Sequence, residues 1–395
     1  MPAIARAKAR GYRVSVTDFN PDAEGFAVAD EHAVISTRDV EKTIAFAKNL
    51  HRLQPLHGVM TIASESAMTV AGVAEALGLP GTSPRSARLA TNKVERQEAF
   101  TAAGISTPRF FRVSSAAQAI SAGEELGWPV VVKPADSAGS RGVRKISSRE
   151  EMASAVTEIR SISDCPEFLI EEFLTGSEHS IEGLVLDGTV YWTAFSDRNY
   201  DKKEICPPYF IEDGDTLPTS LATDVEEAAR IEATKAVCAL GITGGPVKGD
   251  ILIDRRGPRI IEMAARLSGD YFCHETAPLH NGVDLLSATI DFSLGLTIAI
   301  DRLQPRLNQG VALRYYWPSP GIVKSIKGFE KARALPGVRF VKLEPRWRDL
   351  AIGSKITAPT SMGERMACVL ASASTRAKAI DIAEQAVSML RIDTE

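Results

Sequence analysis

Two acidic residues occupy matching positions in a predicted β-hairpin in the central third of the chain. Residues 251–253 and 259–263 are rich in β-branched and apolar side chains, and a polar Gly-Pro turn separates them, which is typical of a hairpin. A hairpin folded symmetrically about Arg256 sets Asp250 directly opposite Glu262. Opposed carboxylates repel unless a positive group lies between them. The pattern therefore predicts a divalent-cation site, with a solvated hairpin bearing surface acids as the alternative.

The residue types around this pair indicate which cation and which chemistry to expect. The same symmetry places Leu252 and Ile260 on the face of the acids. Two oxygen ligands suit Mg²⁺, or Mn²⁺ in its place, that keeps waters and is completed by substrate phosphates. Arg266 follows Glu262 by four residues, and its planar guanidinium can reach a phosphoryl oxygen.

Upstream residues are suited to holding those phosphates. Lys133 ends a run of three valines that reads as a buried strand, where an ammonium needs an anionic partner. The loop that follows lacks the GxxxxGK[ST] pattern, but its small residues let main-chain N–H groups wrap a phosphate chain. Its candidate residues are Gly139, Ser140 and Gly142. A plain surface turn is the alternative.

A second strand can serve a nucleotide base. The exposed main-chain edge at its end can pair with adenine, and Glu178 beyond it can accept hydrogen bonds from ribose hydroxyls; an ordinary hairpin strand is the alternative. The edge consists of Glu171, Glu172, Phe173 and Leu174. Lys93 opens a helix predicted over residues 91–103 and would by default be a surface lysine.

Composition limits the partners and the compartment. The chain has 395 residues, of which 44% are hydrophobic, which is enough for two or three domains with their own cores. A net charge of −4 gives no general attraction to nucleic acid or to anionic membranes. Five scattered cysteines without CxxC spacing indicate free thiols in a reducing compartment. The chain has no apolar run that approaches the length of about 18 residues that a transmembrane helix needs. We therefore expect a cytoplasmic protein. Its expected substrates are small molecules.

Helix and strand patterns alternate in the first 80 residues. In order they are helix 3–9, strand 12–19, helix 40–49, strand 58–63 and helix 67–77. This alternation predicts a small parallel sheet flanked by helices. The strand and glycine-rich turn that normally precede such a first helix are missing, so either translation starts upstream of Met1 or the lobe lacks a central strand. We favour the upstream start.

Together the motifs follow an order that resembles a known family. Lys93, Lys133 with its glycine loop, the edge at 171–174 with Glu178, and the acid pair with Arg266 occur in the order found in the ATP-grasp superfamily. The chain most resembles its carboxylate-amine ligase branch, which includes L-amino-acid (dipeptide) ligases; glycinamide ribonucleotide synthetase and biotin carboxylase are more distant relatives. The resemblance covers nearly the whole chain.

The resemblance implies an ATP-grasp fold of mixed α/β and α+β class. It implies a pre-ATP-grasp α/β lobe over residues 1–88, an ATP-grasp body over 89–299 with a hinged lid near 127–187, and a carboxy-terminal α+β lobe over 300–395. It also implies that the two lysines and the glycine loop hold ATP phosphates, that the strand edge holds adenine, that Glu178 holds ribose, and that the acid pair binds Mg²⁺. A homodimer is compatible with this shape.

One position departs from the family pattern. Members commonly carry Glu-Met-Asn-x-Arg or Glu-Ile-Asn-x-Arg, whereas this chain has Ala264 between Glu262 and Arg266. Alanine cannot ligate a metal, so a second Mg²⁺ would bind more weakly or take its ligands from water, substrate or another residue.

The resulting hypothesis is an ATP-dependent ligase that joins a carboxylate, expected to be an amino acid, to an amine through an acylphosphate, releasing ADP and phosphate. Arg266 and the main chain of Ser268 and Gly269 would stabilise the acylphosphate and the tetrahedral oxyanion. The alternatives are a biotin-carboxylase-like or carbamoyl-phosphate-forming enzyme and a non-catalytic nucleotide-binding protein. Bicarbonate dependence would mark the former, and the absence of amino-acid-dependent ADP release the latter.

Three further features are candidates for substrate contact. The irregular polar and aromatic segment 196–215 is the candidate acceptor-substrate loop, with a solvated loop as the alternative. His274 lies where it would border the acyl site, although a lone histidine is more often structural. Arg314 has the chemistry to bind a substrate carboxylate.

Overall fold

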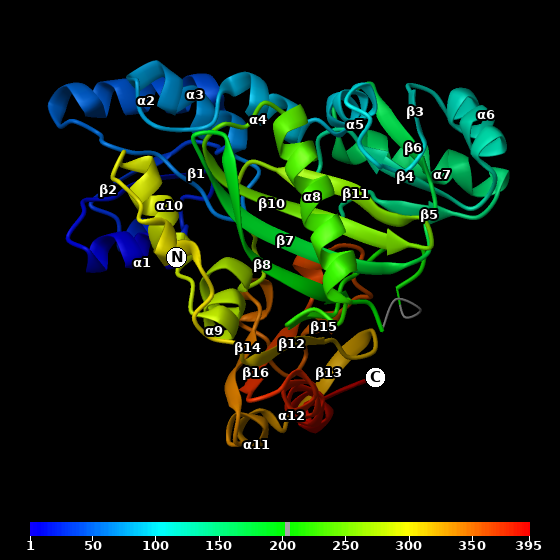
Figure 1. Ribbon diagram of the computed structural model, residues 1–395. Helices are drawn as coiled ribbons and strands as arrows, with labels where there is room; N and C mark the ends of the chain where they lie inside the picture. Colours follow the sequence, from blue (N-terminus) through cyan, green and yellow to red (C-terminus); the bar gives the residue numbers. More distant parts are fainter. Residues whose placement is uncertain (202–205) are drawn as a thin grey trace.

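The computed structural model describes residues 1–201 and 206–395, and a large mixed assembly of helices and sheets runs through it (Figure 1). At its centre is a sheet of eight strands whose neighbours are all antiparallel. In sheet order the strands are β11 (Gly257–Ala264), β10 (Gly245–Asp254), β7 (Ser177–Leu186), β8 (Thr189–Asn199), β9 (Gly214–Leu217), β12 (Gly310–Tyr316), β16 (Ala367–Ala373) and β14 (Val338–Leu343). The predicted mixed fold class is confirmed.

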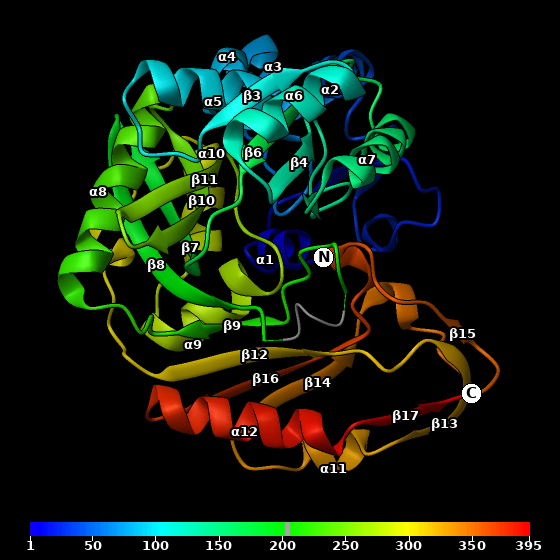
Figure 2. The same cartoon turned by 90° about the vertical axis from the view of Figure 1, so that its right-hand side faces the viewer.

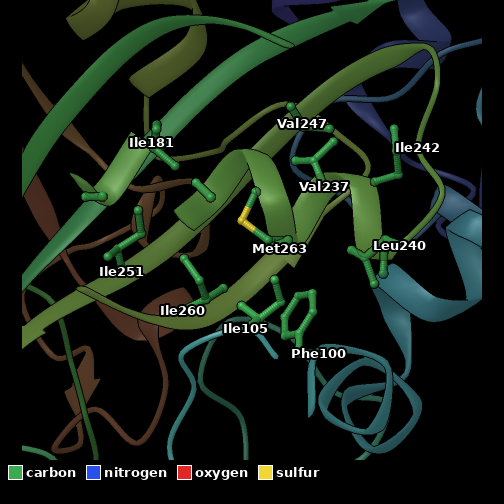
Figure 3. Close-up of a cluster of buried hydrophobic side chains, with 14 of the residues drawn as sticks. Phe100, Ile105, Ile181, Val237, Leu240, Ile242, Val247, Ile251, Ile260 and Met263 are labelled. Carbon is green, nitrogen blue, oxygen red and sulfur yellow. The ribbon is translucent and has the colours of Figure 1, made fainter. Parts of the chain in front are cut away.

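One face of the β10–β11 hairpin packs into a hydrophobic core. Helix α8 (Thr223–Ala239) covers this face, and Figure 3 shows Val247 and Ile251 of β10 with Ile260 and Met263 of β11 gathered in the cluster. Because strand side chains alternate between faces, burying these residues turns their sequence neighbours to the other face. The hairpin therefore presents its polar residues on the side away from α8.

The hairpin register differs from the symmetric one in an informative way. Asp250 pairs with Glu262 as predicted, but Ile260 pairs with Ile251 and not with Leu252, because a β-bulge interrupts the register after Asp250. The two-residue turn at 255–256 pairs Asp254 with Gly257, which shifts the register by one residue from the register that is symmetric about Arg256. The bulge adds one residue to β11 and shifts the register back, so that Asp250 still pairs with Glu262.

A smaller four-stranded antiparallel sheet forms the lid region. In sheet order its strands are β3 (Phe110–Val113), β6 (Phe168–Glu172), β4 (Val130–Pro134) and β5 (Arg144–Ile146). Two helices pack with it, α6 (Ala116–Leu126) and α7 (Arg149–Ile162), and share a buried apolar cluster with the strands. This unit begins before the predicted lid boundary at 127, and β7 beyond it belongs to the large sheet.

The amino-terminal part is simpler than predicted. Its elements are α1 (Pro2–Ala9), β1 (Ser15–Asp18), β2 (Glu31–Val34), α2 (Val40–Leu53) and α3 (Ala67–Leu77), and β1 and β2 form a two-stranded parallel sheet. The strand expected over residues 58–63 is wrong, since only a single bridge from Ile62 to Leu267 forms there. The helix expected over 91–103 is α5 (Lys93–Ala102), which starts where the Asn92 side chain accepts from the N–H groups of residues 94 and 95, and an unpredicted helix, α4 (Pro84–Thr91), precedes it.

The carboxy-terminal residues add three strands to the central sheet. Figure 2 shows β12, β14 and β16 beside β9, with α12 (Arg376–Met389) lying along their outer face. The remaining elements are α9 (Ala277–Asn281), α10 (Leu285–Ser293), α11 (Phe329–Arg333) and a small sheet of β15 (Lys355–Ile356), β13 (Gly321–Lys327) and β17 (Arg391–Thr394). In the described ranges, no helix is both long and apolar enough to cross a membrane.

Candidate active site

The polar face of the β10–β11 hairpin brings Asp250 and Glu262 opposite each other. Lys248 accompanies them: its Nζ lies 3.0 Å from both carboxylate oxygens of Asp250 and 3.5 Å from Glu262 Oε1. A lysine that was not among the predicted site residues therefore supplies the positive charge that the opposed acids require. The alternation of side chains along a strand could have identified Lys248, because residues two apart lie on the same face and Lys248 precedes Asp250 by two.

Two arginines from other elements add to this charge pattern. Nη1 of Arg198, on β8, lies 3.1 Å from Asp250 Oδ2, and Nη2 of Arg96, on α5, lies 4.0 Å from Glu262 Oε2. Burial raises the pKa of both carboxyls, but neighbouring cations together outweigh it, with Arg198 and Lys248 acting on Asp250 and with Lys248 and Arg96 foremost at Glu262, so both pKa values lie below their ordinary range. Both acids are therefore ionised at neutral pH.

This ligand set fits Mg²⁺ as a site with two protein ligands. Ionised oxygen donors are what Mg²⁺ prefers. Ala264 pairs with Lys248 and lies two residues from Glu262 on the same face of β11, where its methyl group offers no donor. In the part of the chain that the structure describes, no cluster of three His, Cys, Asp or Glu residues is placed to hold a metal. The other ligands would be water and phosphate oxygens.

Of the two predicted phosphate lysines, Lys93 at the start of α5 is buried and Lys133 near the end of β4 is partly buried. Lys133 forms an ion pair with Glu171, whose other oxygen accepts from Gln97 Nε2 at 3.1 Å. Glu171 is thus buried as the counter-ion of Lys133. Lys93 donates to the carbonyl of Ser137, and burial lowers its pKa to about 8, with neighbouring cations adding to the effect. A phosphate would supply the negative charge that favours protonated Lys93.

The glycine loop curls over the same region. Gly139, Ser140 and Gly142 all have φ between 60° and 70°, the left-handed region that turns a loop back on itself. Glu65, from the segment before α3, accepts from the Ala138 N–H at 3.1 Å and pairs with the loop residue Arg141. The amino-terminal lobe therefore contacts the loop that was predicted to cover the phosphates.

A cavity of about 210 Å³ opens where these elements meet. Lys93, Glu262 and Arg266 all line it, so the structure gathers three of the predicted site residues at one opening. The other wall comes from the loop and the amino-terminal lobe, through Asp136, Ser137, Ala138, Arg38, Ser64 and Glu65. Charged groups of both signs on an otherwise small-residue wall suit a small zwitterionic substrate.

The predicted adenine edge has aromatic neighbours. The Phe173 ring stacks on Phe210 with centroids 6.2 Å apart, and Lys145 Nζ lies 4.4 Å above the Phe173 ring. Glu172 is engaged with Arg109, accepting from its main-chain N–H at 3.0 Å. Leu174 lies two residues beyond the end of β6, and Glu178, on β7, is the register partner of Leu252 on β10. The roles of these residues toward a nucleotide stay predictions.

Two candidate substrate residues lie outside this cavity. Arg314 is 5% exposed and donates to Thr216 Oγ1 at 3.0 Å and to the carbonyls of Asp215 and Leu313. Its hydrogen bonds to Asp215 and Thr216 hold β12 to β9, and its predicted contact with a substrate carboxylate stays a prediction. His274 lies in a single π-helical turn, and burial lowers its pKa to about 4, so it is a neutral, largely buried histidine.

The candidate acceptor loop divides into described and undescribed parts. Residues 202–205 lie outside the described residues, so the prediction for the whole segment stays untested. On the far side, Pro208 accepts from the Lys145 N–H at 3.0 Å, and the Tyr209 hydroxyl lies 3.2 Å from both carboxylate oxygens of Glu158. These contacts join the segment to β5 and α7 of the lid region.

A buried acid, Glu182, supports the turn that carries Arg266. Its Oε1 accepts from the Ser268 N–H at 2.5 Å, and its Oε2 has no hydrogen-bond partner among the described residues. Burial raises the pKa of Glu182 from 4.5 to about 7. The folded protein therefore binds this proton more tightly than the unfolded chain, and stability is lost as the pH rises from about 4.5 through about 7.

We expect Glu182→Gln to raise the thermal midpoint at pH 8 and to leave it unchanged or lower at pH 4.5. A pKa shift of this size corresponds to about 3 kcal/mol at pH 8. Thermal unfolding of both proteins at the two pH values measures the difference. Glu226→Gln, which alters a partly exposed ion pair on α8, is the control. A Glu182→Gln protein with the wild-type pH dependence would refute the assignment.

Comparison with known proteins gives consistent matches along the chain. Residues 4–81 match a family model described as an ATP-grasp N-terminal domain, residues 126–274 one described as an ATP-grasp domain, and residues 314–395 one described as L-amino acid ligase C-terminal domain 2. A crystal structure of L-amino acid ligase from Bacillus licheniformis superimposes with a TM-score of 0.84 at 22% identity, covering 100% of this chain and 95% of that one.

Curated relatives are similar over parts of the chain. An uncharacterized protein, y4rH, from Sinorhizobium fredii is 27% identical over 91% of this chain and 73% of its own length. D-alanine–D-alanine ligase B from Pseudomonas putida is 30% identical over 47% of this chain and 58% of that ligase, and alanine–anticapsin ligase from Bacillus subtilis is 26% identical over 68% of this chain and 59% of that ligase. The chain thus spans less than two thirds of either named ligase.

Proposed function

The chain belongs to the ATP-grasp superfamily of ADP-forming ligases, and on that premise we propose that it joins the carboxylate of an amino acid to an amine through an acylphosphate. The observation that carries the proposal is the ionised pair Asp250 and Glu262, of which Glu262 lines a cavity together with Lys93 and Arg266. Relatives with printed activities link alanine units or alanine and anticapsin, which supports an amino-acid substrate here.

The first step would transfer the γ-phosphoryl group of ATP to the substrate carboxylate, with ADP as the leaving group. Lys93, Lys133 and the N–H groups of the glycine loop would bind and orient the phosphates. The family uses ATP, generally with Mg²⁺, and Asp250 and Glu262 are the residues that would hold the metal. When bound, Mg²⁺ supplies charge neutralisation on the phosphates as they transfer.

The second step would be attack of the amine on the acyl carbon, with phosphate leaving and one proton lost from nitrogen. Arg266 lines the cavity and lies next to the turn whose Ser268 N–H is held by Glu182. A guanidinium placed there stabilises the oxyanion that forms on the former carbonyl, a contribution of about 3 kcal/mol for a well-placed donor. No covalent protein nucleophile is needed.

A phosphate-release screen tests the proposal. The protein is incubated with ATP and Mg²⁺ and with amino acids singly and in pairs, with bicarbonate as a separate arm. We expect ADP and phosphate in equal amounts only when a suitable carboxylate and amine are both present. Phosphate release that needs bicarbonate and no amine would favour a carboxylase, and nucleotide binding without turnover with any pair would mean a non-catalytic protein.

Ala264 gives a finer prediction about the metal. Ala264→Asn places an amide oxygen on the face of Glu262, where it can add a neutral ligand. We expect the Mg²⁺ concentration for half-maximal phosphate release to fall severalfold while turnover at saturating Mg²⁺ changes little. Ala264→Val, which adds bulk without an oxygen, is the control. An unchanged Mg²⁺ titration in an active Ala264→Asn protein would place residue 264 away from the metal.

A further inference from the structure

The segment that follows Arg266 has a strained backbone. Asp270 and Tyr271 are consecutive residues with φ of 52° and 63°, a left-handed conformation that residues with a side chain seldom adopt. Such a conformation persists only when surrounding structure holds it in place. Because this turn also contains Ser268 and lies directly beyond Arg266, whatever holds it also fixes the proposed oxyanion-stabilising group.

Residues from the carboxy-terminal part of the chain hold this turn in place. Arg365 is 3% exposed, and its Nη2 lies 2.5 Å from Asp270 Oδ1. Its own position is set by Nε, which donates to the Met362 carbonyl at 2.9 Å, and by Nη1, which donates to the Glu212 carbonyl at 3.3 Å. The guanidinium also lies 3.8 Å above the ring of Tyr315. These four contacts thus hold the Arg365 guanidinium in one position, and from there it holds the Asp270 side chain.

Tyr271 is held from the same direction. Its hydroxyl donates to Glu344 Oε1 at 3.3 Å, its ring packs on Phe340 with centroids 5.0 Å apart, and Lys342 Nζ lies 5.1 Å from the ring centroid. All three partners lie on or next to β14. Both residues with left-handed backbone are therefore anchored on residues beyond 339, although the turn itself belongs to the ATP-grasp body.

One more contact links this segment to the phosphate loop. The Met362 N–H donates to the Gly139 carbonyl at 3.3 Å, three residues before Arg365. The same short stretch thus touches the glycine loop at one end and the turn beyond Arg266 at the other. A group that contacts both halves of the proposed site can set their relative position.

We propose that Arg365 is a positioning residue for the ligase reaction, and that through Asp270 it holds the turn bearing Arg266 and Ser268 in its reactive geometry. The inference rests on the proposed function for its kinetic tests. It assigns the carboxy-terminal lobe a part in the reaction itself: without Arg365, ATP would still bind, but the turn would relax and the oxyanion would lose its aligned donor.

Kinetics of Arg365→Met, Arg365→Lys and Asp270→Asn test this role. For Arg365→Met we expect kcat to fall at least tenfold with the KM for ATP within twofold of wild type, and we expect Arg365→Lys to restore part of the loss. Arg346→Met removes an exposed arginine that pairs with Glu364 on the same stretch and should leave kcat within twofold. Arg365→Met with at least half the wild-type kcat would overturn the proposal.

The double variant Arg365→Met/Asp270→Asn shows whether Arg365 acts through Asp270. Losing Arg365 leaves the Asp270 carboxylate close to the buried acids Glu212 and Asp215, so we expect the double variant to be no slower than Arg365→Met alone. Effects that multiply would mean that Arg365 acts elsewhere. If Arg365→Met fails to fold, Asp270→Asn decides: an unchanged kcat contradicts the proposal.

Hydrogen–deuterium exchange gives a readout that does not depend on activity. Peptides covering residues 266–272 should exchange faster in Arg365→Met, or in Arg365→Lys if only that variant folds, but not in Arg346→Met. Unchanged exchange there would contradict the positioning role. A wild-type protein without amino-acid-dependent phosphate release would instead refute the proposed function, and the exchange result would still decide whether Arg365 holds the turn.

Discussion

Glu262→Gln is expected to lower amino-acid-dependent phosphate release by about a hundredfold to a thousandfold, because it removes one of the two carboxylates that would hold the metal at the transferring phosphate. Glutamine keeps the shape of the side chain and one oxygen donor but not the charge. The measurement is steady-state phosphate release at saturating ATP and Mg²⁺, and Asp250→Asn should act in the same direction.

The structure also changes what this substitution should do to stability. Opposed acids alone would repel, and their removal would stabilise the fold, but Lys248 and Arg96 hold the Glu262 charge, and they keep its pKa low. We therefore expect a lower thermal midpoint in Glu262→Gln, not a higher one. Glu226→Gln on α8 is again the control. A Glu262→Gln enzyme that retains most of its turnover would rule out the metal assignment.

Lys133→Met is expected to weaken ATP binding by about a hundredfold, since a charge-assisted contact to phosphate is lost and the repulsive carboxylate of Glu171 is left behind. Glu171 is buried and its ion pair is with Lys133. The single variant should therefore also unfold at a lower temperature, because an uncompensated buried charge is costly. Titration calorimetry with ATP and thermal unfolding measure the two effects.

The double variant Lys133→Met/Glu171→Gln separates phosphate binding from charge balance. Removing both charges should restore much of the thermal stability while ATP affinity stays well below that of wild type. Recovery of ATP affinity in the double variant would mean that Lys133 only neutralises Glu171. ATP affinity unchanged in the single variant would exclude Lys133 from the phosphate site altogether.

Local patterns in the sequence predicted the acid pair because they specify a hairpin. The alternation of β10 and β11 buries Ile251, Ile260 and Met263 against α8, which turns Asp250 and Glu262 together to the other face. The bulge was not predictable, because a strand pattern with one extra residue still alternates on each side of the insertion. Lys248 was predictable from the same alternation and was overlooked.

Groups contributed by distant elements could not be predicted in this way. Arg198, Glu65 and Arg365 reach the site from β8, the amino-terminal lobe and the segment before β16, and only tertiary packing brings them there. Residue type alone did not predict the structural role of Arg314, whose guanidinium holds two strands together. A buried arginine needs several acceptors, and main-chain carbonyls can provide them as well as a substrate can.

The most direct test of the account follows oxygen from substrate to phosphate. An amino acid labelled with ¹⁸O in its carboxylate is incubated with the protein, ATP, Mg²⁺ and the amine identified by the screen, and the released phosphate is analysed by mass spectrometry. If an acylphosphate forms at the Asp250 and Glu262 site, each phosphate carries one ¹⁸O from the carboxylate, and the nucleotide product is ADP. Unlabelled phosphate, or AMP with pyrophosphate, would contradict the proposed mechanism.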